Sequence, residues 1–258
     1  MKFIAACCDW TDVAVVECQI AALRYALPNT HFVSVAVRKF SIINCAFLVR
    51  LMAESLPRGS VIVGCVDPRI PGINRIPIAV YFSSIDLYFV GPNTGTISML
   101  LDSFRSDTII HLSYNDWNKN QFLGRNLFSP VAGKLIAGAP IESFGEIISI
   151  EDIYHLNFPK YTILHIDNFG NLKINCRISQ LPVNKFSSIN VNGIPAIFAQ
   201  DFKDITNTQT IEPDQLIVTV GSSLDFLEIQ RKAQNTAAIG AAELLKVEVG
   251  DEISINFN

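Results

Sequence analysis

The order of strand and helix patterns along the chain is the feature that most restricts its fold. Over the first 150 residues, short apolar runs typical of buried strands alternate with segments of helical periodicity. The strand-like runs are KFIAACC, HFVSVAV, SVIVGCVD, IPIAVYF and DLYFVGP, and the helix-like segments are AVVECQIAALRYAL, SIINCAFLVRLMAESL and TISMLLDSF. This alternation predicts a layered α/β domain whose largely parallel sheet is covered by helices on both faces.

The pattern changes near the segment SIEDIYHLNFPK. Beyond it only NTAAIGAAELL is helix-like, and the rest consists of short strand-like runs separated by turn residues, namely YTILHID, LKINCRI, SSINVNG, IPAIFAQ, QLIVTVG, LDFLEIQ and DEISINF. We therefore expect an α/β domain over residues 1–150 and a smaller β-rich domain, a barrel or sandwich, over residues 158–258.

Composition limits the classes of partner. Of the 258 residues, 49% are hydrophobic and 17% are charged, which is ample material for a core. The net charge is −4 and the chain has no basic run, so nucleic acid and anionic membranes are poor candidates. No apolar stretch reaches the ~20 residues of a membrane span. The start, MKFIAACCDW, resembles a secretion signal, but its apolar part is short and Asp9 follows at once. We interpret it as a buried strand of a cytoplasmic protein.

The cysteine and histidine positions argue against a metal site. None of the 6 cysteines lies in C-x-x-C spacing, and most lie within apolar runs, so we interpret them as reduced core residues. The 4 histidines are scattered, with no close pair. We expect no metal and no cofactor.

Two carboxylates follow predicted strands of the first domain. Asp9 closes the first strand, where an α/β fold often binds ligand hydroxyls, although a helix N-cap is an equally good explanation for a carboxylate there. Asp12 fits the N-cap position better. Asp67 closes the third strand, and a loop rich in Pro and Gly leads to Arg75. Such an Asp and Arg can orient a reactive water or form a structural ion pair, and the latter is more common.

Polar residues also gather at turns of the second half. In HIDNFGNLKIN, Asp167, Phe169 and Asn171 offer a carboxylate, an aromatic face and an amide, which suit a nucleoside or an amino acid. The same residues also fit an ordinary hairpin turn. Ser223 lies at a strand end in VGSSLDFLEIQ, which alone indicates only a turn.

The stretch NQFLGRNLFSPVAGKL, residues 120–135, has the composition of an active-site loop. Together with GPNTG, these motifs resemble in order and spacing the S-adenosylmethionine hydroxide adenosyltransferases, a family that includes fluorinases and chlorinases. The resemblance extends along nearly the whole chain. The family opens with Thr-Asp-Phe-Gly, whose Asp holds ribose hydroxyls. Here Cys8-Asp9-Trp10-Thr11 stands in that place, which makes Asp9 the match, and Phe40 falls at an aromatic pocket position.

The other site residues are implied by the same resemblance. Asp67 and Arg75 match a pair that activates the nucleophile in the hydrolases, whereas the halogenating members have Tyr in place of Asp67. IDNFGN matches Ile-Asp-x-Phe-Gly-Asn, so Asp167 would bind the methionine amino group while Phe169 and Asn171 bind adenine. SSLDFLEI resembles Ser-x-Gly-Tyr-Leu-Glu-Ile. This places Ser223 at the methionine carboxylate, with Phe226 nearby.

The family motif Thr-Phe-His-Gly-Arg-Asp aligns without a gap on residues 121–126. Phe122, Leu123 and Gly124 would line the pocket, but Leu123 replaces the catalytic histidine and Asn126 replaces an aspartate. The resemblance implies a S-adenosylmethionine hydrolase, slowed by this loss, that forms adenosine and methionine. A non-catalytic member that binds S-adenosylmethionine or adenosine is the alternative. The resemblance also implies a homotrimer, with Asp9 and Asp67 of one chain facing Asp167, Asn171 and Ser223 of the next.

Overall fold

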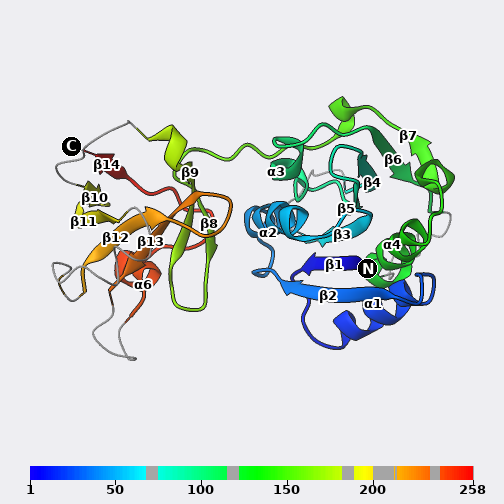
Figure 1. Cartoon of the computed structure of the whole chain (residues 1–258), viewed down its shortest axis with the longest axis horizontal. Coiled ribbons are helices and arrows are strands. Elements are labelled where there is room, and N and C mark those ends of the chain that lie inside the picture. Colours follow the sequence, from blue (N-terminus) through cyan, green and yellow to red (C-terminus); the bar gives the residue numbers. More distant parts are fainter. Residues whose placement is uncertain are drawn as a thin grey trace. The chain divides into compact units, whose positions relative to one another are not determined.

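Two separate seven-stranded sheets organise the chain (Figure 1). The computed structural model describes residues 1–67, 75–114, 122–181, 189–199, 212, 214–232 and 239–257. One unit comprises Met1–Asn157 and the other Phe158–Asn258. The expected fold class, an α/β domain followed by a β-rich domain, is confirmed.

The first unit alternates strands and helices as far as β3. Its strands are β1 (Lys2–Cys8), β2 (Thr30–Ala36), β3 (Ser60–Cys65), β4 (Pro77–Phe82), β5 (Leu87–Pro92), β6 (Thr108–Leu112) and β7 (Gly145–Ile147). Its α-helices are α1 (Val13–Leu23), α2 (Ile42–Ser55), α3 (Ser98–Leu101) and α4 (Ser129–Ile136), with short helices η1 (Gly124–Phe128), η2 (Ile141–Phe144) and η3 (Ile150–Asp152).

The strand order in this sheet is β2-β1-β3-β5-β4-β6-β7. The first four strands are parallel, and β4, β6 and β7 continue the sheet in antiparallel pairing. The parallel part is therefore the centre of the domain. All residues of β1 from Ile4 to Cys8 are buried, as expected for a strand covered on both faces.

Helices cover both faces of the parallel strands (Figure 1). Alternate residues of β1 and β3, such as Ile4 and Val61, form one core with α4 and with Ala22 of α1. The intervening residues face α2, because a Cβ on Gly64 of β3 would lie 3.1 Å from Val49 of that helix. Helix α1 starts where its sequence predicts, since the Asp12 side chain accepts the Ala14 N–H at 3.1 Å.

The turn GPNTG anchors the segment that leads out of this unit. The buried Asn93 side chain donates to the Asp152 carbonyl at 2.9 Å and accepts the Tyr154 N–H at 2.8 Å. At the start of α3, the buried Ser98 hydroxyl accepts the Leu156 N–H at 2.8 Å. These bonds satisfy backbone groups of a segment without regular structure, which fixes its path across the unit.

The second unit is a curled sheet with one short helix. The strand order is β14-β10-β11-β12-β13-β9-β8. The elements are β8 (Ile163–Ile166), β9 (Leu172–Arg177), η4 (Ile178–Gln180), β10 (Ile189–Val191), β11 (Ile194–Ala199), β12 (Leu216–Val220), β13 (Phe226–Arg231), α6 (Ala241–Leu245) and β14 (Ile255–Phe257). Just before β14, the Asp251 carbonyl accepts the Ile163 N–H at 2.9 Å, so backbone bonds link the two edges and the sheet curls toward a barrel.

Some expectations from the sequence need correction or fall outside the described residues. The stretch from Gly124 to Ile136 is helical, not a loop, because its apolar residues recur on one face that packs on the sheet. Strands β6 and β7 were not expected from the sequence. In NTAAIGAAELL only Ala241–Leu245 is an α-helix, and residues 235–238 lie outside the described part. Residues 68–74, between Asp67 and Arg75, and residues 120–121, at the start of the stretch 120–135, also lie outside the described part. In the described parts of the chain, no helix is both long and apolar enough to cross a membrane.

Candidate active site

The carboxyl ends of the parallel strands meet at one edge of the first sheet. Asp9 directly follows β1, Asp67 lies two residues after β3, and Thr94 lies two residues after β5. Because β1, β3 and β5 are parallel neighbours, these three side chains are brought to the same edge. Ligands of open α/β sheets bind at this edge.

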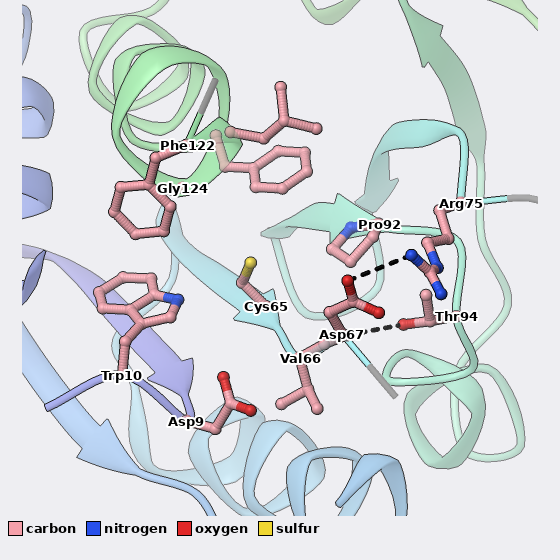
Figure 2. A pocket seen from close by; sticks show the side chains of 12 residues that line it. Asp9, Trp10, Cys65, Val66, Asp67, Arg75, Pro92, Thr94, Phe122 and Gly124 are labelled. Atoms are coloured by element: carbon pink, nitrogen blue, oxygen red, sulfur yellow. Dashed lines mark hydrogen bonds and ion pairs between the residues drawn. The ribbon is translucent and has the colours of Figure 1, made fainter. Parts of the chain in front are cut away.

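A pocket of about 260 Å³ opens at this edge (Figure 2). Its polar side chains come mainly from the strand ends, and most of the others are apolar or aromatic. The lining residues are Asp9, Trp10, Cys65, Val66, Asp67, Arg75, Pro92, Thr94, Phe122, Leu123, Gly124 and Phe128. A mostly apolar cavity with a few convergent polar groups is typical of a small-molecule site.

Asp67 and Arg75 form an ion pair on the wall of this pocket (Figure 2). The Arg75 Nη1 atom donates to Asp67 Oδ2 at 3.2 Å. The Arg75 side chain is 41% exposed and that of Asp67 is 57% exposed. An ion pair this accessible contributes at most about 1 kcal/mol to folding. Its place in the pocket therefore suits a chemical role better than a structural one.

Asp9 is tied to the loop that carries Phe40. The Asp9 Oδ2 atom accepts the Phe40 backbone N–H at 2.9 Å. Phe40 has a φ of 61°, a left-handed conformation that is rare for an aromatic residue. Asp9 also lines the pocket (Figure 2). The structure thus places Phe40 next to Asp9, and Phe40 is 46% exposed.

The segment after Phe122 closes the pocket with apolar groups. Leu123 lines the pocket and packs against the core as it enters the π-helix η1. Arg125 and Asn126 are absent from the pocket lining. Arg125 pairs with Glu17 of α1 at 3.1 Å and donates from Nε to Asn126 at 2.9 Å. Of the three consecutive residues Gly124, Arg125 and Asn126, only Gly124 therefore contributes to the pocket.

The pocket thiol is not an ionised nucleophile. Burial raises the pKa of Cys65 to about 12, partly opposed by the neighbouring Trp10, so the thiol stays protonated at neutral pH. Burial likewise raises the pKa of Cys7 to about 12. Five of the six cysteines are buried and all six are free, in line with the expected core positions.

In the second unit, Asp167 organises the turn between β8 and β9. Its Oδ1 atom accepts the N–H groups of Phe169 at 2.9 Å and Asn171 at 3.0 Å, and its Oδ2 atom accepts the Asn171 side-chain amide at 3.0 Å. Phe169 is 74% exposed. The structure therefore brings these three residues together, with an aromatic face free to stack on a planar ligand.

Ser223 starts the turn between β12 and β13. Its carbonyl accepts the Phe226 N–H at 3.2 Å. Leu224 and Asp225 in this turn both have a φ of 57°, the region that glycine prefers, and Asp225 stands where the family pattern has Gly. Phe226 is only 4% exposed, and the Arg177 guanidinium lies 4.9 Å from its ring centre.

The two turns of the second unit do not meet. In the pairing of β9 with β13, Leu172 is opposite Ile229 and Arg177 is opposite Phe226. The turn of Asp167 precedes Leu172, and the turn of Ser223 precedes Phe226. They therefore lie at opposite ends of these antiparallel strands.

Several pocket residues were not predicted from the sequence. Trp10, Cys65, Val66, Pro92, Thr94 and Phe128 all line it. Five of them adjoin the ends of β1, β3 and β5, so the strand-end rule used for Asp9 and Asp67 could have found them. Within the described ranges, no group of three or more His, Cys, Asp or Glu side chains could hold a metal ion.

Fold and pocket together define a two-domain protein with a candidate small-molecule site at the carboxyl ends of the parallel strands of its α/β sheet. Residues 8–145 match the SAM hydroxide adenosyltransferase N-terminal domain and residues 161–254 match the C-terminal domain of the same family. The chain therefore belongs to the SAM hydroxide adenosyltransferase family.

Its relatives include proteins named (R)-S-adenosyl-L-methionine hydrolase. The protein of that name from Salinispora tropica is 27% identical over 80% of this chain and 78% of its own length. The protein of the same name from Methanocaldococcus jannaschii is 26% identical over 86% of this chain and 81% of its own length. A solved structure of an uncharacterized conserved protein from Thermotoga maritima superposes with a TM-score of 0.81 at 24% identity, covering 98% of this chain and all of the other. This last likeness concerns the fold.

Proposed function

We propose that this protein is a S-adenosyl-L-methionine hydrolase in which water attacks C5′ and releases adenosine and L-methionine. The observation that carries the proposal is the Asp67–Arg75 pair beside Asp9 in one mostly apolar pocket. Relatives that match most of the chain bear the name of this activity. Asp9 would hold the ribose hydroxyls, with Phe40 beside it.

The proposed hydrolysis requires little beyond alignment and activation of the attacking water. Methionine leaves as a neutral thioether, so its departure needs no general acid. The apolar walls exclude bulk water and hold one nucleophile opposite the sulfonium. Asp67 would accept the proton of that water while Arg75 keeps the carboxylate oriented. No metal or other cofactor enters this scheme.

Leu123 makes the reaction slow. The position of the family histidine holds a side chain that cannot accept a proton, and loss of a general base typically lowers a rate by ~10²–10⁴-fold. The same substitution favours the second candidate, a member that binds S-adenosylmethionine or adenosine without turnover. Incubation of the pure protein with S-adenosylmethionine, followed by chromatography for adenosine, distinguishes them. Binding by calorimetry without adenosine formation supports the second candidate, and absence of binding contradicts both.

Replacing Asp9 with alanine should weaken adenosyl binding. The change removes the acceptor for paired ribose hydrogen bonds, and hydrogen bonds to a charged group are strong enough for affinity to fall at least ~10-fold. Calorimetric titration with adenosine measures the effect. Asp12→Ala is the matched control, because Asp12 caps α1 outside the pocket and its loss should leave the affinity unchanged. Equal losses in both variants would argue against ribose binding by Asp9.

We further propose that the protein is a homotrimer with sites shared between neighbouring subunits, as the family resemblance implies. The pocket of the first unit supplies Asp9, Asp67 and Arg75, whereas Asp167, Phe169 and Asn171 are exposed or half-buried on a turn of the second. Light scattering at micromolar concentration should give the mass of three chains. A monomeric mass would contradict this assembly.

A further inference from the structure

Helix α1 exposes an apolar stripe on the side that faces away from its own core. On its inner side Cys18 and Ala22 are buried, and α1 packs so tightly on α4 that a Cβ on Gly133 would clash with the Ala22 carbonyl. On its outer side lie four apolar residues that are between 37% and 69% exposed, namely Val13, Val16, Ile20 and Leu23. The helix sequence VAVVECQIAAL contains a single charged residue. A helix this apolar on all sides is normally buried, so its outer side calls for a cover.

The spacing of the four exposed residues is that of a contact between two helices. They follow one another at intervals of three, four and three residues, as do the a and d positions of a coiled coil. This spacing gives a narrow row, whereas a helix that lies on a membrane has a wide apolar face flanked by several cations. Next to the row, α1 has only Glu17 and, at its C-cap, Arg24. The row therefore fits another helix better than a lipid surface.

The two charges beside the stripe indicate which helix fits. Glu17 and Arg24 are seven residues apart, so they lie on the same flank of the row. When two copies of α1 pack antiparallel about a two-fold axis, this flank of one helix meets the same flank of the other. With Ile20 of one copy against Leu23 of the second copy, Glu17 lies opposite Arg24 of the second copy, and the axis repeats this pair. Such self-complementarity is what a two-fold interface requires.

Other arrangements of the same two helices match the charges less well. In a parallel pairing, Glu17 would face Asp12 of the second copy, because these residues then occupy facing flanks, and the two carboxylates would repel each other. Glu17 also holds Arg125 of its own chain at 3.1 Å, but its side chain remains 40% exposed and can accept a second cation. Charge complementarity therefore favours the antiparallel pairing.

The same side of the domain carries the free edge of a strand. Strand β2 is the outermost strand of the first sheet and pairs with β1, and among the described residues no strand pairs with its outer edge. Its sequence THFVSVA has no Lys, Arg, Asp, Glu or Pro, the residues with which many proteins protect an exposed edge from association. Helix α1 contacts β2 (Figure 1). A partner that covers the α1 stripe would therefore also lie beside this unprotected edge.

We propose that the α1 stripe is an interaction surface for a second copy of this chain, in which two α1 helices pack antiparallel about a two-fold axis. The pairing is independent of the proposed hydrolysis. One helix and the adjoining edge make a small interface, so we expect it to form with a dissociation constant of roughly 10–100 µM. At low micromolar concentration the pair is dissociated, and the mass then reports any other assembly of the chain.

Ile20→Glu tests the surface, because it places a charge in the middle of the stripe. In sedimentation runs from micromolar to submillimolar concentration, the mass of the unmutated protein should double. The substitution should weaken this association at least ~10-fold. Ile147→Glu is the matched control, since Ile147 is an exposed isoleucine of β7, at the opposite edge of the same sheet, and its loss should change nothing. No doubling of the unmutated mass, or equal effects of the two substitutions, would overturn the proposal.

A charge exchange tests the antiparallel arrangement. Glu17→Arg and Arg24→Glu each place like charges opposite one another at both ends of the pair, so each variant alone should associate more weakly than the unmutated protein. A mixture of the two variants places opposite charges at both positions and should restore the association. Circular dichroism checks that Glu17→Arg, which also loses the contact with Arg125, remains folded. If the mixture associates no better than either variant alone, the arrangement is wrong. If Ile20→Glu instead lowers the mass at micromolar concentration, α1 belongs to a different interface and the proposal fails.

Discussion

Leu123→His should raise adenosine formation at least ~10-fold, because an imidazole at this position places a base with an ordinary pKa near ~6.5 in the pocket. Leu123 lines the cavity that holds Asp67 and Arg75, so the new side chain enters the same space. The histidine must be neutral to accept a proton. The gained rate should therefore be present above about pH 6.5 and lost as the pH falls below it. Initial rates measured by chromatography from pH 5 to 9 check both the size and the direction.

Leu123→Gln is the control for this gain. Glutamine adds hydrogen-bonding capacity to the pocket without a group that titrates near neutral pH. A comparable rise in both variants would mean that polarity, not a base, limits the unmutated protein. If neither variant forms more adenosine while both still bind S-adenosylmethionine, the non-catalytic binding member is the better description of this chain.

Asp67→Asn should lower the remaining adenosine formation by ~10²-fold or more, because it removes the acceptor for the proton of water and keeps nearly the same shape. The amide also loses the charge that pairs with Arg75 at 3.2 Å. Since this pair is accessible to solvent, the free energy of unfolding should change by no more than about 1 kcal/mol. A large loss of rate at almost constant stability separates a chemical role from a structural one.

The matched control is Asp102→Asn, which removes another exposed carboxylate that is hydrogen-bonded to a side chain. Asp102 accepts from His155 at 2.8 Å in the same unit and is not part of the pocket lining. Its loss should leave the rate unchanged. If Asp67→Asn behaves like Asp102→Asn, Asp67 is not the acceptor and the proposed route for the proton is wrong.

The strand ends of the first domain show how far the sequence leads toward a site. Asp9 and Asp67 each follow an apolar run, and parallel strands bring their carboxyl ends to one edge, so their proximity follows from the pattern. The pairing of Asp67 with Arg75 was one of two interpretations of the loop, and the geometry gives an ion pair on a pocket wall. The role of Asp12 as an N-cap was likewise predictable, because capping depends on residues two or three positions away.

The stretch from residue 120 to 135 shows where local patterns fail. Its glycine, asparagine and proline suggest a loop, but burial of Leu127, Val131 and Leu135 against the sheet stabilises helix beyond Leu123. Arg125 pairs with Glu17 only because α1 packs beside this helix. Contacts between segments more than a hundred residues apart leave no local pattern.

The sequence by itself determined the two-domain architecture, the parallel centre of the first sheet and the family, because periodicity and motif order are properties of neighbouring residues. Tertiary structure alone decided that the turns of Asp167 and Ser223 lie at opposite ends of paired strands, since strand register depends on packing across the sheet. It also decided that the Trp10 N–H is buried beside the Cys65 thiol. Burial of a single polar atom depends on every segment that surrounds it, and here those segments come from positions spread over the whole first domain.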